Sequence, residues 1–143
     1  MSEILMQVDV TADRTAVWQA LTTHQGITGW WTTRAEVPAG PGGVLKLSFP
    51  DAPMTWDLRV DRAEAPDRLV WHCVGGPPQW IDTEVAFALD PAGQGQGTTV
   101  RFDHVGWRDT DQMFRVVTFG WGQMLARLKG FLDTGKPMPF FDF

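Results

Sequence analysis

The sequence has no tyrosine and only one cysteine among its 143 residues. Cys73 has no partner for an internal disulfide, so nothing in the chain requires an oxidising compartment. Lysine and arginine total 12 against 17 aspartates and glutamates, which leaves a formal net charge of −5. Because binding to phosphates needs a basic patch that releases counterions, this charge argues against a nucleic-acid partner.

Long apolar runs and a basic leader are missing as well. The N-terminus carries Glu3 before a short apolar run from Ile4 to Val10, which predicts a strand rather than a signal peptide. No stretch approaches the roughly 20 apolar residues of a membrane-spanning helix, and the scattered bases form no membrane-binding stripe. We therefore expect a cytoplasmic protein that does not bind membranes.

Aromatic residues are plentiful despite the missing tyrosine, with eight tryptophans and nine phenylalanines. Such residues fill cores because they bury large areas, and they also line apolar ligand pockets. Both roles can hold at once. The length and the shares of hydrophobic (43%) and charged (20%) residues predict one folded domain over residues 1–143.

The longest regular pattern lies in the last third of the chain. Its apolar residues follow one wide helical face: Met113, Phe114, Val117, Trp121, Met124, Leu125, Leu128, Phe131 and Leu132. Asp109 and Asp111 provide N-cap chemistry, whereas Gly135 and Pro137 are stop signals. The spacing predicts a helix from about residue 109 to 134, about 38 Å long and able to cross the whole domain.

Residues 34 to 107 show the alternation of antiparallel strands separated by turns. The alternating positions are Leu45, Leu47 and Phe49; Met54, Trp56, Leu58 and Val60; residues 69–74; Val85, Phe87 and Leu89; and Val100, Phe102 and His104. Before them come the first strand, a short helix capped by Asp13 and a helical turn from His24 to Trp31. The pattern predicts an α+β fold with two short helices after the first strand and a long C-terminal helix across the sheet.

Four motifs occur in the order and spacing of a known family. They are Val17-Trp18-x-Ala20-Leu21 followed by Trp30-Trp31 and Gly42-Gly43; Glu64-x-Pro66-x-Arg68-Leu69; Gly97-Thr98-x-Val100 through His104-x-Gly106; and Gly120-Trp121-x-x-Met124-Leu125-x-x-Leu128 through Gly135. Together they resemble the activator-of-heat-shock-ATPase-homologue-like branch of the START-like (Bet v 1-like, SRPBCC) superfamily. The resemblance implies a helix-grip fold, in which a curved antiparallel sheet of six or seven strands wraps around the C-terminal helix and leaves a cavity.

The resemblance carries no shared catalytic set, because the superfamily includes lipid and sterol carriers, flavonoid binders and aromatic polyketide cyclases. We expect a small apolar or aromatic ligand between the sheet and the C-terminal helix. The predicted lining is Trp56, Trp71, Phe87, His104, Met113, Val117, Gly120, Trp121 and Met124. Two other hypotheses stay open: an enzyme of polyketide-cyclase type, and a protein-binding module that activates a chaperone ATPase.

Few residues indicate catalysis or a cofactor. His24, His72 and His104 show no metal-ligand spacing, and no glycine-rich segment fits a phosphate loop, so we expect neither a metal nor a cofactor. His104 shares the inward parity of its strand and is either a hydrogen-bonded structural residue or a polar anchor or acid–base group of the cavity. Asp82 and Glu84 are expected on the solvent side.

Three further features allow more than one interpretation. Gly120 lies on the sheet-facing side of the predicted helix, where its missing side chain leaves either a cavity or room for a close contact with Trp56 or Trp71. Phe119 and the tail from Pro139 to Phe143 look exposed. They pack on the chain's own surface, cover the cavity, or form an oligomer contact such as a homodimer.

Overall fold

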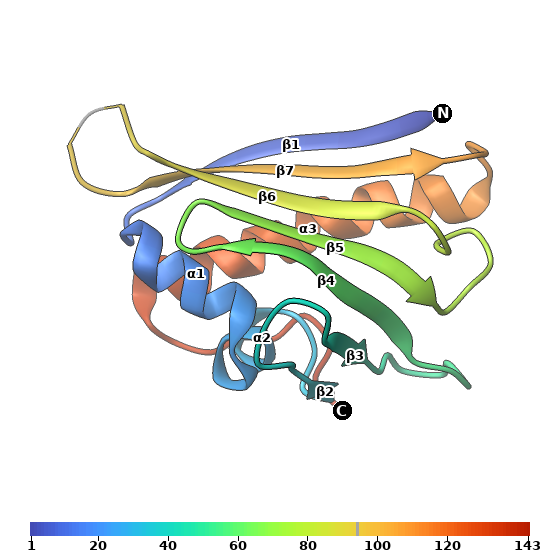
Figure 1. The fold of residues 1–143 in the computed structure, drawn as a ribbon. Helices are drawn as coiled ribbons and strands as arrows, with labels where there is room; N and C mark the ends of the chain where they lie inside the picture. Colours follow the sequence, from blue (N-terminus) through green and yellow to red (C-terminus); the bar gives the residue numbers. More distant parts are fainter. Residues whose placement is uncertain (94) are drawn as a thin grey trace.

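A seven-stranded antiparallel sheet curves around one long helix in the computed structural model, which describes residues 1–93 and 95–143 (Figure 1). The elements are β1 (Ser2–Val10), α1 (Arg14–Thr22), α2 (His24–Trp30), β2 (Ala35–Glu36), β3 (Val44–Leu47), β4 (Trp56–Glu64), β5 (Arg68–Gly75), β6 (Glu84–Pro91), β7 (Thr98–Trp107) and α3 (Gln112–Thr134). The predicted α+β helix-grip architecture is confirmed, including the two short helices after the first strand.

The strand order is β1-β7-β6-β5-β4-β3-β2, so the first and last strands pair while the others follow one another as neighbours. Phe49 and Met54, which the alternation assigned to strands, lie instead in the connection between β3 and β4. Pro50 and Pro53 explain the difference, because proline lacks the N–H that a sheet ladder needs.

The sheet has one apolar face and one charged face. Alternation alone could not orient β5, but the structure buries Leu69, Trp71 and Cys73 and turns Val70 and His72 to the outer face. Arg101 and Asp103 on β7 are exposed, as expected. The inner face and the three helices share one core of buried apolar side chains.

Helix ends follow the capping chemistry of the sequence. The carboxylate of Asp111 accepts a hydrogen bond from the backbone N–H of Phe114 at 3.2 Å, so α3 begins at Gln112 rather than at residue 109. Gly135 ends the helix with a φ of 76°, the left-handed conformation that glycine adopts without strain. Asp13 caps α1 through the N–H of Ala16 at 2.9 Å. None of the helices in the described chain is long and apolar enough to cross a membrane.

The C-terminal tail packs on the chain's own surface, beside the end of α2 and β2 (Figure 1). The N–H groups of Phe140 and Phe141 donate to the carbonyls of Trp30 and Trp31 at 3.0 and 2.8 Å. The N–H of Thr33 donates in turn to the carbonyl of Phe141 at 3.0 Å. The interpretation that the tail packs locally is therefore confirmed. Phe119, in contrast, is 72% exposed.

Candidate ligand-binding hollows

A hollow of about 190 Å³ lies beneath the N-terminal half of α3, and we call it the helix hollow. Its walls come from α3, from β4, from the segments next to α2, β3 and β6, and from the tail. Every lining side chain is apolar: Trp31, Phe49, Trp56, Trp80, Met113, Val116, Val117, Gly120, Met124 and Phe141. The helix hollow can therefore take up an apolar molecule, but no side chain of its wall can transfer a proton.

Gly120 is the position where the helix leaves this space open. A Cβ atom built on Gly120 would meet no heavy atom within 4 Å, so no strand residue packs closely against it. The close-contact interpretation of Gly120 is therefore wrong. The α3 residues that line the hollow run from Met113 to Met124, whereas Leu125 and Leu128 further along the helix are buried and do not line it.

Aromatic contacts hold the walls of the helix hollow in place. The Phe49 ring makes edge contacts with Trp56 and Phe141, with centroids 4.8 and 4.9 Å apart. Trp31 stacks on Trp71 at 5.9 Å with only 17° between the ring planes. Such contacts between large rings restrict rotamer changes, so the hollow has a defined shape rather than a loosely packed surface.

The structure brings five of the nine predicted site residues together at the helix hollow: Trp56, Met113, Val117, Gly120 and Met124. It places the other four in the packed interior, where Trp71, Phe87, His104 and Trp121 are at most 1% exposed. Trp71 also borders a second hollow, described below. The periodicity of a strand or helix predicts that a residue points inward, but it does not distinguish a residue that faces a cavity from one that is fully packed. The four buried residues were therefore predicted to line the cavity although they belong to the packed core.

Sequence reasoning missed five lining residues, namely Trp31, Phe49, Trp80, Val116 and Phe141. Trp31 carried a signal, because the Trp30-Trp31 pair is part of the family motif. Phe141 carried another, because an apolar tail was one candidate for a cavity cover. Phe49 and Trp80 lie outside the regular strands, where no periodicity indicates the direction of a side chain.

His104 is a fully buried residue whose two ring nitrogens both have partners. The indole N–H of Trp121 donates to Nδ1 at 3.0 Å, so the proton of the neutral ring sits on Nε2. Nε2 lies 2.8 Å from the hydroxyl of Thr83, which itself donates to the carbonyl of Trp80 at 2.6 Å. We call Thr83, His104 and Trp121 the His104 cluster. Its hydrogen bonds are those of a structural histidine.

Burial also keeps the His104 ring neutral. Removal from solvent disfavours the charged imidazolium and lowers the pKa of His104 to about 3. At neutral pH the ring is therefore not an imidazolium acid: its one N–H, at Nε2, faces the Thr83 hydroxyl, and its acceptor nitrogen is occupied by Trp121. The arrangement therefore does not support a general acid or base at this position.

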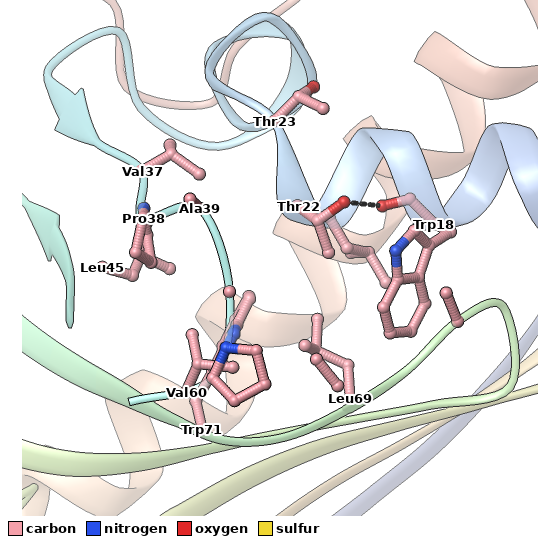
Figure 2. Close-up of a pocket in the computed structure, with 15 residues that line it drawn as sticks. Trp18, Thr22, Thr23, Val37, Pro38, Ala39, Leu45, Val60, Leu69 and Trp71 are labelled. Atoms are coloured by element: carbon pink, nitrogen blue, oxygen red, sulfur yellow. Dashed lines mark hydrogen bonds between the residues drawn. The ribbon is translucent and has the colours of Figure 1, made fainter. Parts of the chain in front are cut away.

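A second and larger hollow, of about 420 Å³, lies between α1, the loop before β3 and the inner face of β4 and β5. We call it the loop hollow (Figure 2). Figure 2 shows Pro38 of the loop and Trp18 of α1 on opposite sides, with Leu69 and Trp71 of the sheet below. Its hydroxyls are paired locally, as Thr22 donates to the carbonyl of Trp18 at 2.7 Å. Trp71 belongs to its wall and stacks on Trp31 of the helix hollow, so this pair of rings links the two hollows.

On the outer face, Asp61, His72 and Glu84 come from three neighbouring strands and place potential metal-ligating atoms within 4.8 Å of one another. No sequence spacing could have predicted this group. Arg59 donates to Asp61 at 2.6 Å and, through this hydrogen bond, lowers the pKa of the Asp61 carboxyl. Asp82, exposed as expected, lies 3.1 Å from Nε2 of His72. With Asp61 engaged by Arg59, these residues act as a surface ion-pair network.

The seven-stranded sheet around α3 and the hollow between them define a helix-grip protein of the START-like class. The family described as "Activator of Hsp90 ATPase homolog 1-like protein" matches residues 11–133, and the chain belongs to this family. A search of curated proteins finds no match.

Solved structures share the fold over nearly the whole chain. The Aha1 dimer from Colwellia psychrerythraea is 28% identical, with a TM-score of 0.86 over 95% of this chain and 99% of that chain. DynU16, from the dynemicin biosynthetic locus, is 25% identical, with a TM-score of 0.80 over 100% of this chain and 51% of that one. CalU16 from Micromonospora echinospora is 26% identical, with a TM-score of 0.69 over 96% and 77%.

Proposed function

We propose that the protein binds a small apolar or aromatic molecule in the helix hollow. The observation that carries this proposal is the open space at Gly120, lined by apolar side chains from six parts of the chain. Glycine inside a helix costs about 1 kcal/mol relative to alanine. A space that this glycine keeps open, walled by ordered aromatic rings, is what an apolar ligand needs.

The loop hollow is larger, but volume is the weaker criterion. Its lining contains Thr22 and Thr23 and the backbone of a proline- and glycine-containing loop, so it offers no continuous apolar wall. The helix hollow has such a wall and lies where the helix-grip fold predicts the ligand. We therefore assign the ligand to the helix hollow.

Binding is supported better than catalysis of the polyketide-cyclase type. The lining of the helix hollow contains no titratable side chain, and His104 lies outside it with both nitrogens engaged. The similar protein DynU16 comes from a biosynthetic locus, which is compatible with a small-molecule ligand for this fold. This similarity does not identify an acid–base residue in the present chain.

Native mass spectrometry of the protein as purified tests the proposal directly. We expect a bound small molecule, or saturable quenching of tryptophan fluorescence on titration with indane, an apolar two-ring probe. The Gly120→Leu variant should lose both signals, because leucine fills the hollow. Unchanged binding in this variant would show that the ligand site lies elsewhere.

A protein-binding role is the second candidate, favoured by two exposed apolar side chains on α3. Val116 is 60% and Phe119 is 72% exposed, and the similar Colwellia protein is described as a dimer. We include a homodimer through this face in the proposal. Light scattering should then give a smaller species for Phe119→Lys than for the native chain. Stimulation of a chaperone ATPase that Phe119→Lys abolishes would instead favour a chaperone partner.

We also propose that the protein is located in the cytoplasm. The only cysteine, Cys73, is buried, and burial raises the pKa of its thiol to about 11. A thiol of this kind stays protonated and unreactive, in keeping with a reducing compartment.

A further inference from the structure

An apolar strip lies on the exposed side of α3, next to the helix hollow. It consists of Val116 and Phe119, which are 60% and 72% exposed, and it continues into the hollow because Val116 also belongs to the wall. Figure 1 shows α1 and α2 beside the C-terminal end of α3, away from these two residues. A contiguous apolar surface that leads into an apolar hollow is typical of a contact with a partner.

Phe119 cannot fill the hollow of its own chain. It directly precedes Gly120, and neighbouring residues of a helix point in different directions, so the Phe119 ring is not part of the wall. The same ring on a second copy of the chain has no such restriction. A dry apolar cavity of roughly 150 Å³ holds benzene, so about 190 Å³ accommodates the ring of one phenylalanine. The hollow and Phe119 therefore match each other in size and in polarity.

The positions of the two features on α3 favour a two-fold arrangement. Because Phe119 and Gly120 are adjacent, a two-fold axis near them brings each Phe119 to the hollow of the other copy, and both contacts form at once. Gly120 allows this approach, since a Cβ atom built on it would meet no heavy atom within 4 Å. The contact is closed by its symmetry, and two copies are sufficient to fill both hollows.

Charged residues at the edge of the strip do not oppose such a contact. Arg115 precedes Val116 on α3, Asp51 follows Phe49 of the wall in the connection between β3 and β4, and both charged residues are exposed. The edge therefore carries both signs although the chain has a net charge of −5. Opposite charges of two copies can pair around the inserted rings and fix their register.

We propose that two copies of the chain dimerise by inserting Phe119 of each copy into the helix hollow of the other. The ring takes the place of the ligand, so a hollow holds either Phe119 or a small molecule. Ligand binding therefore releases the dimer, and dimerisation in turn weakens ligand binding. This inference rests on the proposed function, because it assigns the contact of the homodimer and gives the ligand a regulatory effect.

Two substitutions remove the two halves of the contact. Phe119→Lys should raise the dimer dissociation constant at least about a hundredfold, because two rings lose their burial. Gly120→Leu should also give monomers, because leucine fills the hollow although Phe119 is still present. The matched controls are Leu5→Lys, at another exposed apolar position, and Gly130→Leu, on α3 but outside the hollow, and both should remain dimeric. Analytical ultracentrifugation measures the dissociation constants.

Indane tests the exclusion between ligand and dimer. Saturating indane should convert the native chain to monomers. At a protein concentration where about nine tenths of the hollows hold Phe119, the apparent affinity for indane should be about tenfold lower than in Phe119→Lys, whose hollow is free. A dimer that is isotope-labelled in one copy reports the contact itself. NOEs should connect the Phe119 ring of one copy with the methyl groups that line the hollow of the other, those of Met113, Val117 and Met124.

The outcomes separate this inference from the ligand proposal. A native chain that stays monomeric at every concentration, or a dimer that persists in Gly120→Leu or at saturating indane, overturns the inference and leaves the ligand proposal in place. If indane does not bind even to Phe119→Lys, the ligand proposal fails together with the regulatory effect, whereas the NOEs still decide the dimer contact. Loss of the dimer in Phe119→Lys and Gly120→Leu, with NOEs between the copies of the native chain, supports the inference.

Discussion

Two groups of aromatic residues lie under α3 and differ in how closely they are packed. In the His104 cluster, Trp121 and Thr83 occupy both ring nitrogens of His104, and no space remains. In the helix hollow, the rings of Trp31 and Trp80 line an open space with apolar surface. Trp80 borders both, with its ring 4.6 Å from that of His104. The same residue types thus make a packed core on one side of Trp80 and an unfilled wall on the other.

Filling the hollow should produce the largest effect. Gly120→Leu places a side chain in the open space, so binding of indane should become undetectable while the melting temperature stays level or rises. Calorimetry for stability and an NMR titration for binding measure the two effects. A clear fall in melting temperature would mean that the space beneath Gly120 is not open.

Gly130→Leu is the matched control for this substitution. Gly130 lies on the same helix, a Cβ there also meets nothing within 4 Å, and it lines neither the helix hollow nor the loop hollow. The variant should gain a similar stability from helix propensity and keep its binding. Loss of binding in both variants would point to a general disturbance of α3 rather than to a filled site.

Disrupting the His104 cluster should show the opposite pattern. His104→Phe leaves the indole N–H of Trp121 without an acceptor in a buried site, and should lower the free energy of unfolding by about 1–3 kcal/mol. Binding of indane should change by less than about twofold, which is less than the loss of one hydrogen bond to the ligand would cause. Denaturant unfolding and the same titration measure both quantities. Weakened binding with unchanged stability would make His104 a ligand anchor after all.

The pH dependence of stability should report the same cluster. Unfolded histidine takes up a proton near pH 6.5, whereas His104 in the folded protein stays neutral down to a pKa of about 3. The unfolded state therefore binds more protons between these values, and stability falls as the pH is lowered through them. From pH 7 to 5 the loss should be about 2 kcal/mol. His104→Phe should remove this slope, and His24→Gln should retain it.

Removing the tail should give the smallest effect. Truncation after Met138 deletes Phe141 from the wall of the hollow and the hydrogen bonds to Trp30 and Trp31. We expect a loss of about 1–2 kcal/mol from partly buried apolar area, and weaker binding of indane. The molecular mass in light scattering should stay the same. A smaller species would assign the tail to an oligomer contact instead.

The periodicity of the sequence predicted α3 and the strand of His104, but it did not predict which of their inward residues line the hollow and which are packed in the core. The spacing of α3 placed Met113, Val117, Gly120 and Met124 toward the sheet, and the structure has them at the hollow. The inward parity of His104 was also right. Whether an inward residue meets open space or a packed neighbour depends on long-range contacts. Those of Trp80 and Phe141, from a connection and from the tail, follow no period that a sequence could reveal.

A methyl NMR titration with indane tests the central claim most directly. The helix hollow is lined by the methyl groups of Met113, Val116, Val117 and Met124, and the loop hollow by those of Leu21, Val37, Leu45, Val60 and Leu69. The account predicts saturable shifts of the first group only. Shifts centred on the second group, or no saturable shift in the first, would contradict it.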